Sequence, residues 1–260
     1  MWHDNFQKGI NPKWQIGEIG EGRVIHQAHA LHLTLPPTDE DTYSDAQITD
    51  YIPQQRNFTL TAPLRLTVTA YSTQPANQMV GTAGFGFWNH PFVPNEKGFR
   101  VPQALWFFFG APPNDMPLAK GVRGNGWKAA TFNAHRWQFY ALLPTAPIAI
   151  PLMHIPPAYD VLWTIGQRAI GVTETLLAPD LLQSAHTYML EWHPDHVIFA
   201  VDGDTVQIAR HGISKNPLGF IAWIDNQYAI VSPKGRFGFG ISRVPQSQSL
   251  ILNDIKIEKL

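Results

Sequence analysis

The last third of the sequence constrains the fold most, because it is a series of short apolar segments separated by turns. Six segments have the length and the β-branched or aromatic content of strands: 187–192, 196–203, 205–211, 219–224, 235–241 and 249–260. The intervening stretches include His-Pro-Asp and Asp-Gly-Asp, whose residues favour tight turns. This pattern predicts antiparallel sheets packed face to face.

The composition agrees with one β-sandwich domain over residues 1–260. The chain has 260 residues, within the range of single sandwich domains, and 20 Gly with 22 Pro punctuate it. A net charge of −1 argues against a nucleic-acid or anionic membrane partner. The absence of cysteine excludes disulfides, thiol nucleophiles and cysteine metal sites.

The middle of the chain differs from the rest. Residues 144–185 begin with several prolines, which we take to exclude an interior helix or a central strand there. Residues 159–167 and 175–184 each suit a short helix, whereas 128–143 is compatible with a strand or a helix. We therefore expect one short, partly helical insertion around 144–185 that caps a sheet or roofs a cleft.

Two stretches of the sequence bear on the cellular location of the protein. Residues 1–10 lack the basic and apolar regions of a secretion signal, and the most apolar segment is too short to span a bilayer. We expect a cytoplasmic protein without membrane contact.

Residues 186–204 (HTYMLEWHPDHVIFAVDGD) resemble a strand pair of glycoside hydrolase family 16 and related concanavalin A-like jelly rolls. Other pieces similar to this family occur in its order: 4–16, 84–92, 217–227 and 252–260. The resemblance implies an all-β, concanavalin A-like sandwich with a concave cleft.

One part departs from the family. Its hydrolases carry Glu-x-Asp-x-(x)-Glu on a catalytic strand, and retaining enzymes need two carboxyl groups about 5–5.5 Å apart. The corresponding strand here is 103–110, QALWFFFG, which offers Gln103, Leu105 and Phe107 or, shifted by one, Ala104, Trp106 and Phe108. Neither register contains an acid, so the usual mechanism cannot operate on this strand. Both faces of the strand are core, or one face forms the floor of an apolar cleft.

The candidate ligand-binding residues follow from this alternative and from the resemblance. Each aromatic residue among them could equally belong to the core, and the polar ones could form a turn. The candidates are Trp88, Asn89, Trp106, Phe108, Tyr188, Trp223, Asn226 and Gln227.

Two residues are candidates for catalysis. Asp225 follows an apolar strand, and apolar neighbours would raise the pKa of its carboxyl group. His90 adjoins aromatic residues near the expected cleft. We otherwise expect the concave side to be free of paired acids.

For cofactors, we expect none beyond one possible structural ion. The resemblance implies a calcium site on the convex side, in which Asp254 matches the family's aspartate. The histidine spacings match no zinc motif.

Three functions remain open on the sequence. The first is a non-hydrolytic protein that holds a carbohydrate or a glycosylated or apolar small molecule in an aromatic cleft. The second is an atypical enzyme, such as an isomerase, a cyclase or an unusual hydrolase, acting on an apolar small molecule. The third is a structural or interaction domain with no small ligand. The sequence does not decide whether the chain is an enzyme.

Overall fold

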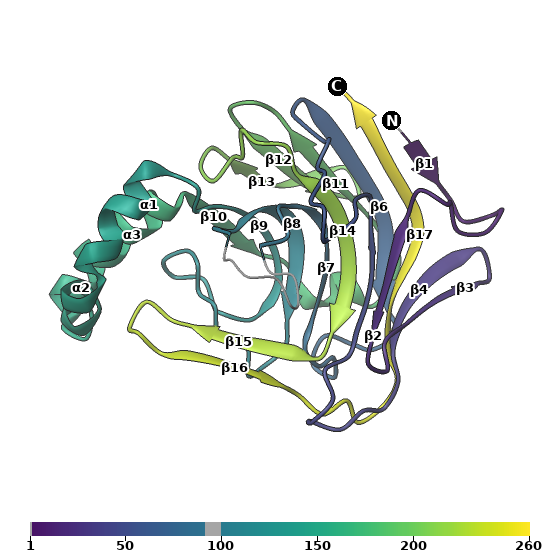
Figure 1. The fold of residues 1–260 in the computed structure, drawn as a ribbon, viewed down its shortest axis with the longest axis horizontal. Helices are drawn as coiled ribbons and strands as arrows, with labels where there is room; N and C mark the ends of the chain where they lie inside the picture. The colour runs from purple at the N-terminus through teal and green to yellow at the C-terminus, as the bar shows by residue number, and fades with distance from the viewer. Residues whose placement is uncertain (1, 92–99) are drawn as a thin grey trace.

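Two large antiparallel sheets form the body of the molecule in a computed structural model, which describes residues 2–91 and 100–260 (Figure 1). Sheet A has the order β13-β12-β11-β6-β17-β4-β3, with β1 beside β17. Its strands are β1 (Trp2–Asp4), β3 (Arg23–Gln27), β4 (Ala30–Leu35), β6 (Leu64–Ser72), β11 (His186–Trp192), β12 (Val197–Val201), β13 (Asp204–Ala209) and β17 (Gln248–Lys259).

Sheet B has the order β10-β9-β8-β7-β14-β5-β2. Its strands are β2 (Gln15–Ile19), β5 (Asp45–Thr49), β7 (Thr82–Trp88), β8 (Gln103–Gly110), β9 (Gly126–Asn133), β10 (Val172–Leu176) and β14 (Gly219–Asp225). A separate hairpin, β15 (Gln227–Val231) and β16 (Phe237–Ile241), continues from the end of β14. The turn-separated apolar segments expected from the sequence are therefore strands.

The main core lies between the two sheets, and every second side chain along their strands points into it. On β6, Leu66 and Val68 are buried while their neighbours are only partly buried, and on β8 Leu105 and Phe107 face the same core. Its centre is aromatic, because the ring of Phe107 lies 5.3 Å from that of Phe199 on the opposite sheet. Both faces of β8 are largely buried, as the unbroken apolar run of this strand predicts.

Three helices follow β9 and project from the sandwich in Figure 1: α1 (Trp137–Leu142), α2 (Ala146–Leu152) and α3 (Pro156–Ile170). Two short 3₁₀ turns cover Leu143–Thr145 and Pro179–Leu182. The ambiguous segment 128–143 divides between the end of β9 and α1. The helix expected at 159–167 lies within α3, which ends at Gly171 with the left-handed φ of 62° that glycine adopts without strain.

One expectation for the middle of the chain was wrong. Prolines do not exclude a helix there, because Pro147 occupies the first turn of α2 and Pro151 lies near its end, where few backbone bonds depend on its missing N–H. The insertion around 144–185 is partly helical, as expected: α2 and α3 lie within it, and β10, also within it, forms the edge of sheet B. Within the described residues, no helix is long and apolar enough to cross a membrane.

Candidate functional site

The outer face of sheet B, meaning the face turned away from sheet A, carries a second apolar cluster. On β14, Phe220, Ala222 and Ile224 point into the main core, so Ile221 and Trp223 point outward. Outside the main core, Ile221 and Trp223 pack with Phe108 of β8. The cluster is bordered by Trp88, Trp106 and Met116. The outward register of β8 is therefore Ala104, Trp106 and Phe108.

Four rings form a continuous row on this face, which we call the aromatic row: Trp88, Trp106, Phe108 and Trp223. The Trp106 ring lies 5.4 Å from both Phe108 and Trp223, and 5.9 Å from Trp88. Phe108 and Trp223 are 9% and 7% exposed, whereas Trp88 and Trp106 remain partly exposed. The two partly exposed indoles are thus the surfaces that a ligand can reach, and offset ring packing of this kind is stabilising in itself.

Two glycines of the sequence GFGFW make room for the row. Gly84 of β7 lies between Trp223 and Phe108 in the strand register, and a Cβ there would come within 2.8 Å of Trp223. Gly86 faces Trp106 in the same way, at 2.6 Å from its Cβ. The intervening Phe85 fills the core on the other face. The glycines therefore let large rings on neighbouring strands lean over the central strand.

Hydrogen bonds fix one end of the row. The Trp88 indole N–H donates to the Tyr51 hydroxyl oxygen at 2.7 Å, and the Tyr51 hydroxyl lies 2.9 Å from Nδ1 of His90. Tyr51 can donate to His90 only if Nδ1 is unprotonated, so the neutral tautomer carries its proton on Nε2. Burial lowers the pKa of His90 to about 4, and the positive charge of Arg56 adds to this. His90 is therefore a neutral acceptor that orients Trp88.

Asp225 lies on the same face, at the end of β14. Its Oδ1 accepts hydrogen bonds from the backbone N–H and the hydroxyl of Thr82, and its Oδ2 accepts one from the Gln227 amide at 2.8 Å. The Thr82 hydroxyl in turn accepts from the Trp223 indole at 2.9 Å, which joins the carboxyl group to the aromatic row. Burial raises the pKa of Asp225 to about 7.

A second buried carboxyl group accompanies Asp225. Asp45 of β5 is its direct partner in the strand register, and it faces outward because Ala46 and Ile48 face the core. Burial, reinforced by the nearby charge of Asp225, raises the pKa of Asp45 well above its usual value. Two carboxyl groups on adjacent strands repel when both are ionised, so at least one holds a proton near neutral pH. The expectation that this face lacks paired acids was wrong, and nothing in the sequence adjacent to Asp45 indicated the pairing.

Tyr188 does not belong to this site, contrary to the expectation from the resemblance. It is 1% exposed in the main core, where its ring lies 5.0 Å from that of Phe107, and its hydroxyl donates to the Leu181 carbonyl oxygen. The alternation of β11 places Tyr188, Leu190 and Trp192 together on the core side. The hairpin was correctly identified as strands, but sequence similarity gave no reliable direction for this ring.

The predicted amides have mainly local roles. Asn226 is fully buried and bonds the Ser44 N–H and the carbonyl oxygens of Thr42 and Ser242. Asn89 bonds Val101 and the N–H of Gln103. Of the three amides, only that of Gln227 contacts the site, through Asp225. Asn89 and Asn226 hold loops around the site.

Residues 111–125 cover part of the outer face, a role that we had expected for the helical insertion. Met116 of this loop packs against the cluster, and Glu174 accepts hydrogen bonds from the N–H groups of Leu118 and Ala119. Glu174 also forms an ion pair with Lys128 at 2.7 Å, and both side chains are at most 2% exposed. The aromatic row is therefore bounded by a carboxyl pair on one side and a buried ion pair on the other. No sequence pattern indicated this ion pair.

The proposed calcium ligand lies elsewhere. Asp254 is on β17 beside β1, and its Oδ2 is 2.6 Å from Nε2 of His3. Calcium takes six to eight oxygen ligands, and no group of three or more metal-binding His, Cys, Asp or Glu side chains occurs in the described part of the chain. The surroundings of Asp254 thus resemble a surface ion pair more than an oxygen cage, and the calcium site stays a prediction.

Comparison with known proteins identifies the fold. No protein-family model matches the sequence, and no curated protein matches it significantly. Solved structures do match over nearly the whole chain. One, from work on endo-acting O-glycanases of the human gut microbiota that initiate mucin breakdown, has a TM-score of 0.57 at 12% identity and covers 100% of this chain and 99% of its own.

Two further structures agree. A laminarinase from Flavobacterium sp. UMI-01 has a TM-score of 0.55 at 13% identity, covering 100% of this chain and 99% of its own. A family 16 glycoside hydrolase from Bacteroides ovatus, solved with a mixed-linkage glucan product, has a TM-score of 0.51 at 12% identity and covers 99% of both chains. The chain therefore has the concanavalin A-like jelly-roll fold of the family 16 glycoside hydrolases.

Proposed function

We propose that this chain binds a carbohydrate on the outer face of sheet B, through the aromatic row, and does not hydrolyse it by the two-carboxylate mechanism. The observation that carries the proposal is the outward register of β8, which presents Trp106 and Phe108 beside Trp223 and contains no acid. Indole faces of this kind stack on the apolar faces of sugar rings, and their polar edges reach hydroxyl groups.

Retaining hydrolysis needs one carboxyl group as nucleophile and another as proton donor on either side of the bond. The carboxyl pair of Asp45 and Asp225 is buried at the end of the row, and four hydrogen bonds from Thr82 and Gln227 already engage Asp225. This engagement supports a binding role for the face, because a nucleophile needs a free lone pair directed at the sugar.

The structurally similar laminarinase and mixed-linkage glucan hydrolase suggest the first probes, which are laminari-hexaose and a mixed-linkage tetrasaccharide. Isothermal titration calorimetry should show binding that W106A weakens about tenfold or more, equivalent to about 1.4 kcal/mol. W137A is the matched control, because Trp137 is 74% exposed on α1. No binding of either probe, equal affinities of W106A and W137A, or release of shorter saccharides would contradict the proposal.

A second candidate function rests on the raised pKa of Asp225. A carboxyl group that titrates near pH 7 beside an apolar surface suits general acid–base catalysis on an apolar small molecule. A thermal-shift screen with terpenoid and polyketide-like compounds tests it, because a ligand of the folded state raises apparent stability. Turnover of a hit that D225N abolishes, with binding retained, would favour this enzyme over the binding protein.

A further inference from the structure

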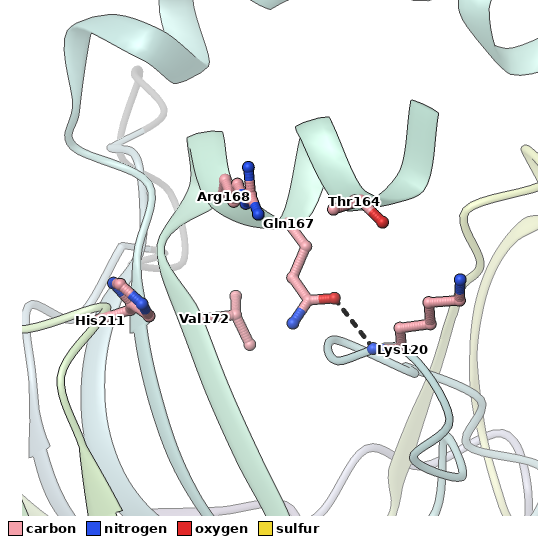
Figure 2. Close-up of a pocket in the computed structure, with 6 residues that line it drawn as sticks. All are labelled: Lys120, Thr164, Gln167, Arg168, Val172 and His211. Carbon is pink, nitrogen blue, oxygen red and sulfur yellow. Dashed lines mark hydrogen bonds between the residues drawn. The ribbon is translucent and has the colours of Figure 1, made fainter. Parts of the chain in front are cut away.

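Two neighbouring cavities lie away from the aromatic row, around the end of α3 and the loop 210–216. The smaller, of about 320 Å³, is bordered by Lys120, Arg168, Val172 and His211 (Figure 2). The larger, of about 520 Å³, is bordered by His135, Arg136, Arg210 and Lys215, and also by His211. His211 lines both, and Arg136 joins the two sides by donating from Nη1 to the Arg168 carbonyl oxygen at 2.8 Å. We call the two cavities together the basic groove.

The charge of the basic groove differs from that of the whole chain. The chain has 19 basic and 20 acidic residues, yet the linings contain five basic residues and one acidic residue, Asp195. Among the described residues, Arg136, Arg168 and Lys215 form no ion pair, whereas Lys120 pairs with Asp160 at 2.6 Å and the charge of Arg210 acts on Asp195 without a close contact. Cations that are concentrated around a concave surface attract anions, because the cavity walls focus their field.

The floor of the larger cavity is a rigid polar network. The Gln103 amide donates to Asn133 at 2.9 Å and to the Ser214 hydroxyl, and its oxygen accepts from Asn216. Asn133 in turn donates to the Ile213 carbonyl oxygen. Because each member is held by another, the floor is formed before any ligand arrives, and such preorganisation lowers the cost of binding.

The volume favours an organic anion over a simple ion. A cavity of about 520 Å³ falls in the range of about 300–1,000 Å³ typical of sites for small organic ligands. The cationic side chains lie in two adjoining cavities, so a ligand that carries more than one negative group satisfies them best. Arginine binds carboxylate or sulfate groups through paired hydrogen bonds.

The linings also argue against nucleic acid. Single-stranded nucleic acids are held by aromatic side chains that stack on successive bases, and the basic groove contains no Phe, Tyr or Trp. We therefore propose that the basic groove is a binding site for an acidic oligosaccharide, with Arg136, Arg168, Arg210 and Lys215 holding its carboxylate or sulfate groups. This site is separate from the aromatic row and does not depend on the function proposed for it.

The test is calorimetric titration of the full chain with tetragalacturonic acid and with its methyl ester, which is uncharged. R210Q/K215Q should bind the acid about tenfold more weakly or worse, and R168Q, on the α3 side, should weaken it independently. K8Q/K259Q is the matched control, because it removes the same charge from exposed residues outside the groove. Binding of the acid should also weaken from 0.01 M to 0.1 M salt, as the Debye length falls from about 30 Å to about 10 Å.

Further measurements separate this proposal from the one for the aromatic row and from nucleic-acid binding. W106A should retain the affinity for the acid while losing that for neutral glucans, so failure of one proposal leaves the other standing. The proposal is overturned if the acid does not bind, if the ester binds equally well, or if R210Q/K215Q and K8Q/K259Q weaken it equally. Tighter binding of a single-stranded oligothymidine would assign the groove to nucleic acid instead.

Discussion

Trp223 lies across Gly84 of the adjacent strand, so close that a Cβ on Gly84 would meet the indole at 2.8 Å. The contact links the choice of residue on the central strand of sheet B to the position of a large ring on β14. Gly84 does not need a left-handed backbone here. Its lack of a side chain is what the site requires.

Gly84→Ala should therefore destabilise the protein and displace the aromatic row. The added methyl group would also approach the Phe107 backbone, and overpacking of this kind costs about 1–3 kcal/mol. Urea denaturation followed by tryptophan fluorescence measures both effects. Gly238→Ala in β16 is the control, because its Cβ would meet Ile230 at an ordinary 3.7 Å. Equal midpoints for the two variants would show that the row tolerates the methyl group.

Tyr51→Phe should loosen the same row at its other end. The variant leaves the Trp88 indole N–H and His90 Nδ1 without the hydroxyl that joins them, and an unsatisfied buried polar group costs about 1–3 kcal/mol. Chemical unfolding measures the loss, and the indole N–H resonance of Trp88 should shift in NMR spectra. Tyr140→Phe, at 43% exposed on α1, is the control and should change neither quantity.

The strands follow from sequence pattern, because alternation and turn residues are local signals. Local sequence does not decide to which face of the sheet a ring points. Trp106 and Tyr188 both stand in apolar strands, yet one faces outward and the other lies in the core. Only the packing of the second sheet on one face of the first decides between them, and a run such as WFFF is apolar in either register.

The polar parts of the site were harder to predict for a related reason. Asp225 could be found from its apolar strand, but its partner Asp45 is 180 residues earlier and becomes a neighbour only through the pairing of β14 with β5. Lys128 and Glu174 meet in the same way through β9 and β10. The prolines of α2 led to a wrong prediction because a helix of seven residues needs few of the backbone bonds that proline cannot make.

The carboxyl pair predicts a distinctive pH dependence. The pKa of Asp225 is raised to about 7 in the folded state, above the ordinary 3.8, so the folded protein holds a proton that the unfolded chain releases. The contribution of Asp225 to the free energy of unfolding should therefore be greatest below about pH 4 and should fall as the pH rises to about 7. The slope is about 1.4 kcal/mol per pH unit for one proton.

Asp225→Asn removes this titration while keeping the amide oxygen as an acceptor, so its stability should decline less between pH 4 and pH 7. Burial also raises the pKa of Asp50 to about 7, so Asp50 should still make stability fall with rising pH in that variant. Denaturation midpoints at intervals of half a pH unit give the slopes. Asp195→Asn, on the exposed turn after β11, is the control and should reproduce the parent slope. A parent-like slope in Asp225→Asn would mean that this carboxyl group is ionised throughout the range.

The buried ion pair makes the last prediction. Removing one member leaves a buried charge without its partner, so Glu174→Ala should destabilise by about 3–5 kcal/mol and free the N–H groups of Leu118 and Ala119. Lys128→Met should also destabilise, since it would leave the buried Glu174 carboxyl group with only the two loop N–H groups as partners.

The double variant Lys128→Met/Glu174→Met should recover part of this loss, because two apolar side chains need no charge partner. A double-mutant cycle of denaturation free energies measures the coupling between the two residues. Hydrogen exchange of the Leu118 and Ala119 amides should quicken in every variant that lacks Glu174, because its carboxylate binds residues 111–125 to the sheet. Slow exchange there in the double variant would show that the other contacts of the loop, such as the bond from the Lys120 N–H to Gln167 and the packing of Met116, are enough to hold it over the aromatic row.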